Sequence, residues 1–141
     1  FSTPYLDDDL VLVAKKDSGI TDLESAKGKK VGVQASTTGS DYAKEKGIDA
    51  TGFETGELQV QSLVSGTTDA SLGNQSILRY GIKDKSDLQV VQEIKTGEQL
   101  GVAVKKDDAA MLTAVNDTLA AMDKDGKMAE LKKKWFGDDA A

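Results

Sequence analysis

The sequence contains no cysteine and no histidine among its 141 residues. Without cysteine the chain forms no disulfides and does no thiolate chemistry, and without histidine it lacks the imidazole that most often serves as a general base. The usual zinc sites, which are built from these two residue types, are excluded as well. We therefore expect no catalytic residues, no metal site and no cofactor.

Arginine is scarce, because only Arg79 among the 18 basic residues is an arginine, and the lysines are spread among acidic residues. The net charge of the chain is -6. A protein that binds nucleic acid usually presents a basic patch to the phosphates. We therefore exclude nucleic acid as a partner.

Long apolar runs are also absent, since none approaches the roughly 18 to 20 residues that span a bilayer, and no signal peptide is recognisable. The chain begins without Met at Phe1-Ser2-Thr3-Pro4-Tyr5, which includes the only proline. We interpret this beginning as cut from a longer protein. If the protein is exported, we expect its signal to have been removed.

The composition, with 38% hydrophobic and 30% charged residues, is typical of soluble globular proteins. Short apolar runs alternate with helical patterns. The expected strands are residues 10–14, 31–33, 51–54, 69–72, 88–94 and 101–104, and the expected helices are residues 21–28, 39–46, 57–65 and 75–81. This alternation predicts an α/β fold with a mixed, mostly parallel sheet flanked by helices.

Two local patterns add detail to this prediction. The continuous apolar run from Leu10 to Ala14 is typical of a strand buried on both faces. Thr21 and Glu24 have the spacing of a capping box at the start of the first helix.

The last third of the chain predicts two amphipathic helices separated by a turn at Asp125-Gly126. Their apolar residues recur every three or four positions, as Leu112, Val115, Leu119 and Met122 in the first helix and as Met128, Leu131 and Trp135 in the second. We interpret both stripes as core packing. The lysines from Lys132 to Lys134 are interpreted as a solvated face.

The stretch from Val31 to Ala43 runs from a strand through a hydroxyl-rich turn into a helix. The first N–H groups of a helix have no partner inside it, and the helix dipole is positive there, so this turn suits an anion. Ser36, Thr37 and Thr38 add hydroxyl donors at the same point. The alternative is that one of these residues only caps the helix. No nucleotide-phosphate loop is present, which favours a carboxylate as the anion.

Five short motifs follow one another in a recognisable order. They are Phe-Ser-Thr-Pro-Tyr at 1–5, Gly-Lys-Lys-Val-Gly-Val-Gln followed by Ser-Thr-Thr-Gly-Ser within 28–40, Gly-Thr-Thr-Asp-Ala at 66–70, Gly-Val-Ala-Val-Lys-Lys at 101–106, and a helix over 128–137 that ends Lys-Trp-Phe-Gly. Over essentially its whole length, the chain resembles the C-terminal part of bacterial solute-binding proteins family 3, the extracytoplasmic receptors of polar amino-acid ABC transporters.

The resemblance implies a periplasmic-binding-protein type II-like fold, in which two α/β lobes joined by two hinge strands close over one amino acid. Residues 1-16 are then the end of the first lobe and the first hinge strand, here Leu10 to Lys15. Residues 17-100 are the small ligand-binding lobe, and residues 101-141 are the return hinge strand and two C-terminal helices of the first lobe. Because most of the first lobe is missing, we expect these helices to fold back on the small lobe or to form a homodimer.

The resemblance also implies a ligand site. Gln34 faces the ligand side chain, while Thr37 and Thr38 bind the ligand's α-carboxylate. Ser36 stands where the family usually has glycine, which alters the turn's backbone or adds a hydroxyl contact. Arg79 lies in the wrong element to replace the missing lobe's arginine, which binds the carboxylate in the family.

The position of the acidic residue that holds the ligand's α-ammonium in the family is taken here by Asn74, which is neutral. Asn accepts a hydrogen bond from an ammonium without forming an ion pair, so this contact is weaker than a charge-assisted one. The alternative is that Asn74 is a turn residue in a left-handed conformation after Gly73.

The function that the resemblance implies is the substrate-binding component of an ABC transporter for amino acids or related small polar compounds. Such a receptor works with a cognate membrane permease and does no chemistry. It lies in the periplasm or otherwise outside the cytoplasm, lipid-anchored in a Gram-positive organism. One alternative is an enzyme on the same scaffold, resembling cyclohexadienyl dehydratase, with Glu98 as the acid to examine. The other is an isolated lobe that dimerises without binding a ligand.

Overall fold

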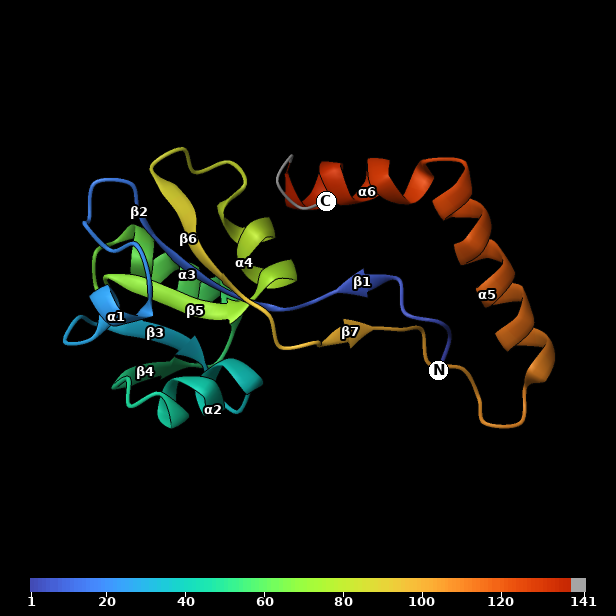
Figure 1. The fold of residues 1–141 in the computed structure, drawn as a ribbon, viewed down its shortest axis with the longest axis horizontal. Coiled ribbons are helices and arrows are strands. Elements are labelled where there is room, and N and C mark those ends of the chain that lie inside the picture. Colours follow the sequence, from blue (N-terminus) through green and yellow to red (C-terminus); the bar gives the residue numbers. More distant parts are fainter. Residues whose placement is uncertain (138–141) are drawn as a thin grey trace. The chain divides into compact units, whose positions relative to one another are not determined.

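The computed structural model describes residues 1–137, which divide into two units. The larger unit is Asp9–Thr96, and the smaller unit combines Phe1–Asp8 with the chain from Gly97 onwards. Figure 1 shows the elements of each unit along the chain. The chain therefore enters and leaves the larger unit once, at neighbouring points.

The larger unit contains a five-stranded sheet with the strand order β4-β3-β5-β2-β6. In chain order the strands are β2 (Leu10–Lys15), β3 (Val31–Gln34), β4 (Ala50–Phe53), β5 (Ala70–Asn74) and β6 (Leu88–Ile94). β3 pairs in parallel with β4 and β5, whereas β2 pairs antiparallel with β5 and β6. Only β2 therefore runs against the other strands, which confirms the mixed, mostly parallel sheet.

Helices cover both faces of this sheet. They are α1 (Leu23–Ala26), α2 (Thr38–Glu45), α3 (Gly56–Val64) and α4 (Gln75–Ile82). Leu10 and Leu12 of β2 pack in one core cluster with residues of α1 and α2, while Val11 and Val13 pack in a second cluster with α3 and α4. The prediction of a strand buried on both faces is confirmed.

The two ends of the larger unit are tied together at its boundary. Asp9 is buried, and its Oδ1 accepts a hydrogen bond from the backbone N–H of Thr96 at 2.9 Å. Lys95 Nζ lies 3.5 Å from Asp9 Oδ2. β2 begins directly after Asp9 and lies between β5 and β6 in the sheet.

The capping box of α1 forms one residue later than we expect from the sequence. Asp22 is the N-cap, and its Oδ1 accepts from the N–H of Ser25 at 2.8 Å. Ser25 Oγ in turn accepts from the N–H of Asp22 at 3.1 Å. The box predicted for Thr21 and Glu24 is wrong, because Glu24 instead accepts from Lys27 Nζ at 2.8 Å on the surface.

The smaller unit contains a short antiparallel pair, β1 (Leu6–Asp7) with β7 (Gln99–Leu100). The strand that the sequence predicts over residues 101–104 is wrong, since this stretch forms no strand. Its Val102 is held by Ser2 instead, whose N–H donates to Val102 O at 2.8 Å and whose Oγ accepts from Val102 N at 2.9 Å. The side chain of Ser2 thus takes the place of the backbone acceptor that a strand would supply to Val102. Pro4, two residues later, has no N–H to donate to a neighbouring strand.

Two C-terminal helices, α5 (Ala109–Lys124) and α6 (Lys127–Phe136), confirm the helical spacing of the last third. Gly126 separates them in a left-handed conformation with φ of 82°. Of the apolar stripe residues only Met128 is buried, and Trp135 is 43% exposed. Among the described residues, the apolar stripe is therefore not fully packed in a core, and that part of the prediction is wrong. None of the described helices is both long and apolar enough to cross a membrane.

Two buried serines give a paired test of hydrogen bonding in the core. Ser71 Oγ in β5 is buried without a partner among the described residues. We therefore expect Ser71→Ala to leave the free energy of unfolding unchanged, or to raise that free energy by up to about 1 kcal/mol. Ser62 Oγ donates to Gln59 O at 2.7 Å. Ser62→Ala should therefore lower the free energy of unfolding by about 1 to 3 kcal/mol. Urea unfolding measures the stability of both variants. Equal losses of stability would contradict the difference in hydrogen bonding between Ser71 and Ser62.

The N-cap of α1 gives a test by pH. The backbone N–H of Ser25, and secondly its side chain, lower the pKa of Asp22 below its usual 3.8. A carboxyl group with a lowered folded pKa stabilises the fold above its unfolded pKa, and this contribution is lost as the pH falls through the folded pKa. We expect an NMR titration of the Asp22 carboxyl carbon to give a lower midpoint than in an unfolded peptide of the same sequence. Equal midpoints would show that the cap does not form.

Candidate ligand-binding site

The carboxyl ends of β3 and β5 meet at one edge of the sheet. The two strands are parallel neighbours in which Val33 is paired with Leu72, and they end at Gln34 and Asn74. α2 follows β3 after a short turn, and α4 follows β5 directly. In open α/β sheets, ligands bind outside the carboxyl ends of the strands.

A small hollow of about 10 Å³ lies at this edge. Its lining residues are Gln34, Thr37, Gln59, Gly73, Asn74, Ile77 and Leu78. The structure thus brings together Gln34, Thr37 and Asn74 of the predicted site residues, while Ser36 and Thr38 are exposed and do not line the hollow. No charged residue is among those that line it.

Thr37 caps α2, as one of the two interpretations of the turn requires. Its hydroxyl donates to Gln34 O at 2.7 Å and accepts from the N–H of Ser40 at 3.4 Å, while Ser40 Oγ accepts from Thr37 N at 3.2 Å. The single hydroxyl proton of Thr37 is therefore used within the protein. The backbone N–H groups of the first turn have no partner inside the helix, and this is the feature that suits an anion.

A glycine allows the start of α2 to lie directly against the end of β5. A β-carbon at Gly39 would stand 3.2 Å from Leu72 O and 3.3 Å from the Cα of Gly73. Contacts this short between a β-carbon and backbone are rare, so a side chain here would push the helix away. Gly39 therefore sets the short distance between the hydroxyl-rich turn and Asn74.

Ser36 has a φ of 59°, and it is the only residue other than glycine with a positive φ among those that the structure describes. The turn therefore keeps the left-handed conformation that glycine adopts without strain. For a residue with a β-carbon this conformation costs about 1 to 2 kcal/mol.

Asn74 is half-buried and has extended backbone angles, with φ of -62° and ψ of 137°. The alternative that it is a left-handed turn residue is therefore wrong. It stands at the N-cap position of α4, but its side chain makes no capping hydrogen bond.

Gln59 is a residue of this site that sequence reasoning missed. It lies in α3 and is 1% exposed, and its Nε2 donates to Gly32 O and to Leu72 O, both at 3.0 Å. Gly32 belongs to β3 and Leu72 to β5, so one side chain joins both strands that carry the site. A polar residue four positions before the buried Leu63, on the same helix face, was the available signal.

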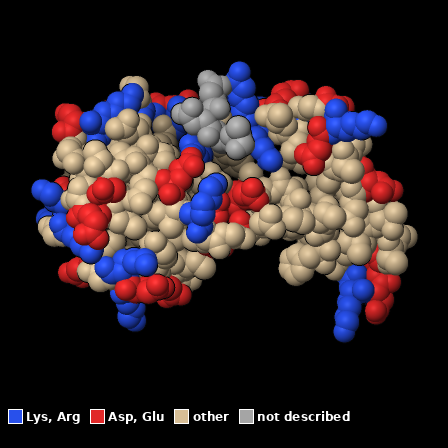
Figure 2. Space-filling model, viewed as in Figure 1, with Lys and Arg blue, Asp and Glu red and all other residues tan. Residues whose placement is uncertain are grey.

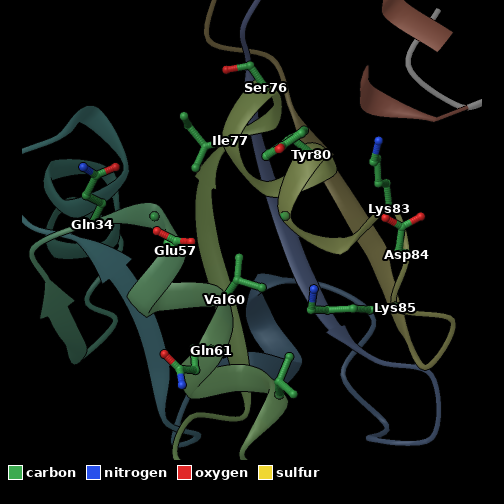
Figure 3. Close-up of a pocket in the computed structure, with 13 residues that line it drawn as sticks. Gln34, Glu57, Val60, Gln61, Ser76, Ile77, Tyr80, Lys83, Asp84 and Lys85 are labelled. Carbon is green, nitrogen blue, oxygen red and sulfur yellow. The ribbon is translucent and has the colours of Figure 1, made fainter. Parts of the chain in front are cut away.

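A larger cavity of about 730 Å³ adjoins the hollow between α3 and α4. Figure 3 shows Glu57, Val60 and Gln61 of α3 and Ile77 and Tyr80 of α4 around it. Gln34 and Ile77 line both the cavity and the hollow. The small hollow and the larger cavity therefore share part of their lining.

The remaining candidate residues lie elsewhere. Arg79 is buried in α4, where it pairs with Glu93 of β6 and its Nε donates to Gln75 Oε1 at 3.2 Å. It therefore joins a helix to the sheet. Glu98 is half-buried in the smaller unit, and its backbone carbonyl accepts from Asp8 N at 2.8 Å.

The charges of the surface are mixed. Figure 2 shows acidic and basic side chains interspersed on the face that it presents. Within residues 1–137, no three acidic side chains are grouped closely enough to hold a metal ion.

Comparison with known proteins gives a consistent set of relatives. The family model for bacterial extracellular solute-binding proteins, family 3, matches residues 1–138. The L-cystine-binding protein TcyJ of Escherichia coli (strain K12) is 34% identical over 99% of this chain and 54% of its own length. The ABC transporter glutamine-binding protein GlnH of Bacillus subtilis (strain 168) is 34% identical over 100% of this chain and 53% of its own length. The chain thus spans about half the length of the curated relatives it matches.

Solved structures agree with this comparison. An ancestral cationic amino acid solute-binding protein is 36% identical, with a TM-score of 0.85 over 96% of this chain and 61% of that chain. The second substrate-binding domain of GlnP from Lactococcus lactis, in an open conformation, is 27% identical, with a TM-score of 0.79 over 99% of this chain and 62% of that chain. The predicted type II periplasmic-binding-protein fold is confirmed.

The left-handed turn before α2 gives a test of strain. We expect Ser36→Gly to raise the free energy of unfolding by roughly 0.5 to 1 kcal/mol, because the strain it relieves exceeds the entropy that glycine loses on folding. Ser36→Ala keeps the β-carbon and is the matched control, for which no gain is expected. Urea unfolding measures both variants, and a loss of stability in Ser36→Gly would contradict the strain.

Proposed function

Because this chain belongs to family 3 of the bacterial extracellular solute-binding proteins, we propose that it acts as part of the substrate-binding component of an ABC transporter for amino acids or a related small polar compound. The observation that carries the proposal is the convergence of Gln34, Thr37 and Asn74 on one hollow at the carboxyl ends of two parallel strands. The relatives named above bind cystine and glutamine by their names. In this role the chain binds a ligand and does no chemistry.

In the proposed site, the backbone N–H groups at the start of α2 hold the ligand's α-carboxylate, with Ser36, Thr37 and Thr38 shaping the turn that presents them. Asn74 accepts a hydrogen bond from the α-ammonium. Gln34 lies at the junction of the hollow and the wider cavity, where a ligand side chain would extend.

We further propose that the larger unit corresponds to the small lobe, and that α5 and α6 belong to the other lobe of the full receptor. The receptor works outside the cytoplasm with a cognate permease. A homodimer through α5 and α6 remains a prediction. It is tested by measuring whether the molar mass in solution is that of one chain or of two.

The proposal predicts weak binding by this chain, and a gain when the ammonium contact is charged. We expect saturable NMR shifts of the amides of residues 36–40 and 74 at millimolar L-glutamine or L-arginine. Asn74→Asp should bind the responding amino acid roughly 5- to 30-fold more tightly, since hydrogen bonds to charged groups are about twice as strong as neutral ones.

The N-acetylated form of the same amino acid is the control ligand, because it keeps the carboxylate but has no ammonium. It should gain nothing from Asn74→Asp. If neither the wild-type chain nor Asn74→Asp shows shifts at these amides for any amino acid, the proposed site is wrong.

A further inference from the structure

The start of α4 differs from the starts of the two helices that precede it in the chain. α2 and α3 follow Thr37 and Thr55, and the side chain of each threonine caps its helix. Asn74 stands at the same position before α4, and its side chain makes no capping hydrogen bond. The first turn of α4 therefore lacks the side-chain cap that fixes the other two helices.

Gln75, the first residue of α4, is instead tied at two points. Its backbone N–H donates to Asp9 O at 2.9 Å, and its side-chain Oε1 accepts from Arg79 Nε at 3.2 Å. Asp9 directly precedes β2, in which Leu10 is paired with Asn74 of β5. One tie therefore joins the start of α4 to the sheet, and the other joins it to a residue one turn further along the helix.

Arg79 is itself anchored to the sheet. It is 6% exposed, and its Nη2 pairs with Glu93 Oε1 of β6. Glu93 is in turn paired with Val11 of β2 in the sheet. A buried cation is costly unless it is paired, and a guanidinium donates from several nitrogens in one rigid plane. A single rigid group thus connects Gln75 to β6.

The bond to Gln75 is an addition to the ion pair. The pair between Arg79 and Glu93 is enough to hold α4 on the sheet. The bond from Nε reaches the residue directly after Asn74. Arg79 lines neither the small hollow nor the larger cavity, so it acts on a ligand only through other residues.

We propose that Arg79 is a positioning residue for the candidate site, because through Gln75 it fixes the first turn of α4 and with it the place of Asn74. Its effect on the ligand rests on the proposed function. Its effect on Asn74 does not, because the same bonds are present in the free protein.

Two variants cut the bond between Arg79 and Gln75, one from each side. Arg79→Lys keeps the positive charge, but a lysine has one nitrogen where the guanidinium uses two for different partners. Gln75→Met keeps an unbranched side chain and the backbone N–H, and it removes the amide. Gln92→Met is the matched control, because it also removes one glutamine acceptor, which bonds to Leu23 N at 2.8 Å at the start of α1.

The first measurement follows the side-chain amide of Asn74 by NMR without ligand. In Arg79→Lys its signals should shift and its order parameter should fall, whereas in Gln92→Met both should match the wild type. Because Arg79→Lys preserves the charge, the change reports the lost bond and not a lost field. If Arg79→Lys does not fold, the order parameter is measured in Gln75→Met instead. An Asn74 side chain as ordered as in the wild type overturns the proposal.

The second measurement compares two ligands by NMR titration. They are L-glutamine or L-arginine, whichever binds, and its des-amino analogue, which keeps the carboxylate and the side chain but has no ammonium. Arg79→Lys and Gln75→Met should each weaken binding of the amino acid by roughly 2- to 10-fold, the value of one net hydrogen bond, and leave the analogue unchanged. Gln92→Met should affect neither ligand.

Equal weakening of both ligands would mean that Arg79 only supports the fold, and it overturns the positioning role. Failure of every amino acid to bind the wild-type chain overturns only the proposed function. The order of the Asn74 side chain in the free proteins then still decides whether Arg79 positions that residue.

Discussion

The larger unit depends on how closely the backbones of β3, β5 and the start of α2 approach one another. Glycine permits close packing here, against the backbone of β5 at Gly39 and against side chains at Gly32. A β-carbon at Gly32 would lie 3.1 Å from the Phe53 ring, and one at Gly39 would lie 3.2 Å from Leu72 O. A β-carbon at Gly73 would make only ordinary contacts, 3.4 Å to Leu78 Cδ1 and 3.6 Å to Gln59 Nε2. Because the side chain of Gln59 bonds to carbonyls of both strands, the spacing of β3 and β5 at the candidate site depends on buried contacts beneath the predicted ligand contacts.

The sequence predicts most of the strands and helices because their buried residues recur with a regular spacing. The apolar run of β2 and the alternation of strands and helices reflect which faces of each element are buried. Both features can be recognised from the local sequence pattern alone. Gln34, Thr37 and Asn74, which line one hollow, were predicted through the order of several motifs. Gln59 could not be found in this way, since its partner Gly32 is 27 positions away in the chain and no local pattern specifies such a bond. The same reason explains the misplaced strand at 101–104, where the side chain of Ser2 takes the place of a backbone acceptor.

The two interpretations of the hydroxyl-rich turn are compatible in the structure. Capping uses the hydroxyls of Thr37 and Ser40 and fixes the first turn of α2, and a fixed first turn aims its backbone N–H groups at a constant point. Capping therefore prepares the helix start for an anion. The hollow beside it has no ionised residue in its lining, so the contacts it offers depend on geometry and change little with ionic strength.

The bond between Asp9 and Thr96 also bears on how such a protein is assembled over evolution. It places the first and last residues of the larger unit within one hydrogen bond of each other. A segment whose ends are adjacent can be inserted into a host chain, or exchanged for a related segment, without moving the host's own strands apart. The larger unit therefore has the geometry of an insertable segment, in which one continuous stretch of gene carries all the ligand contacts proposed above.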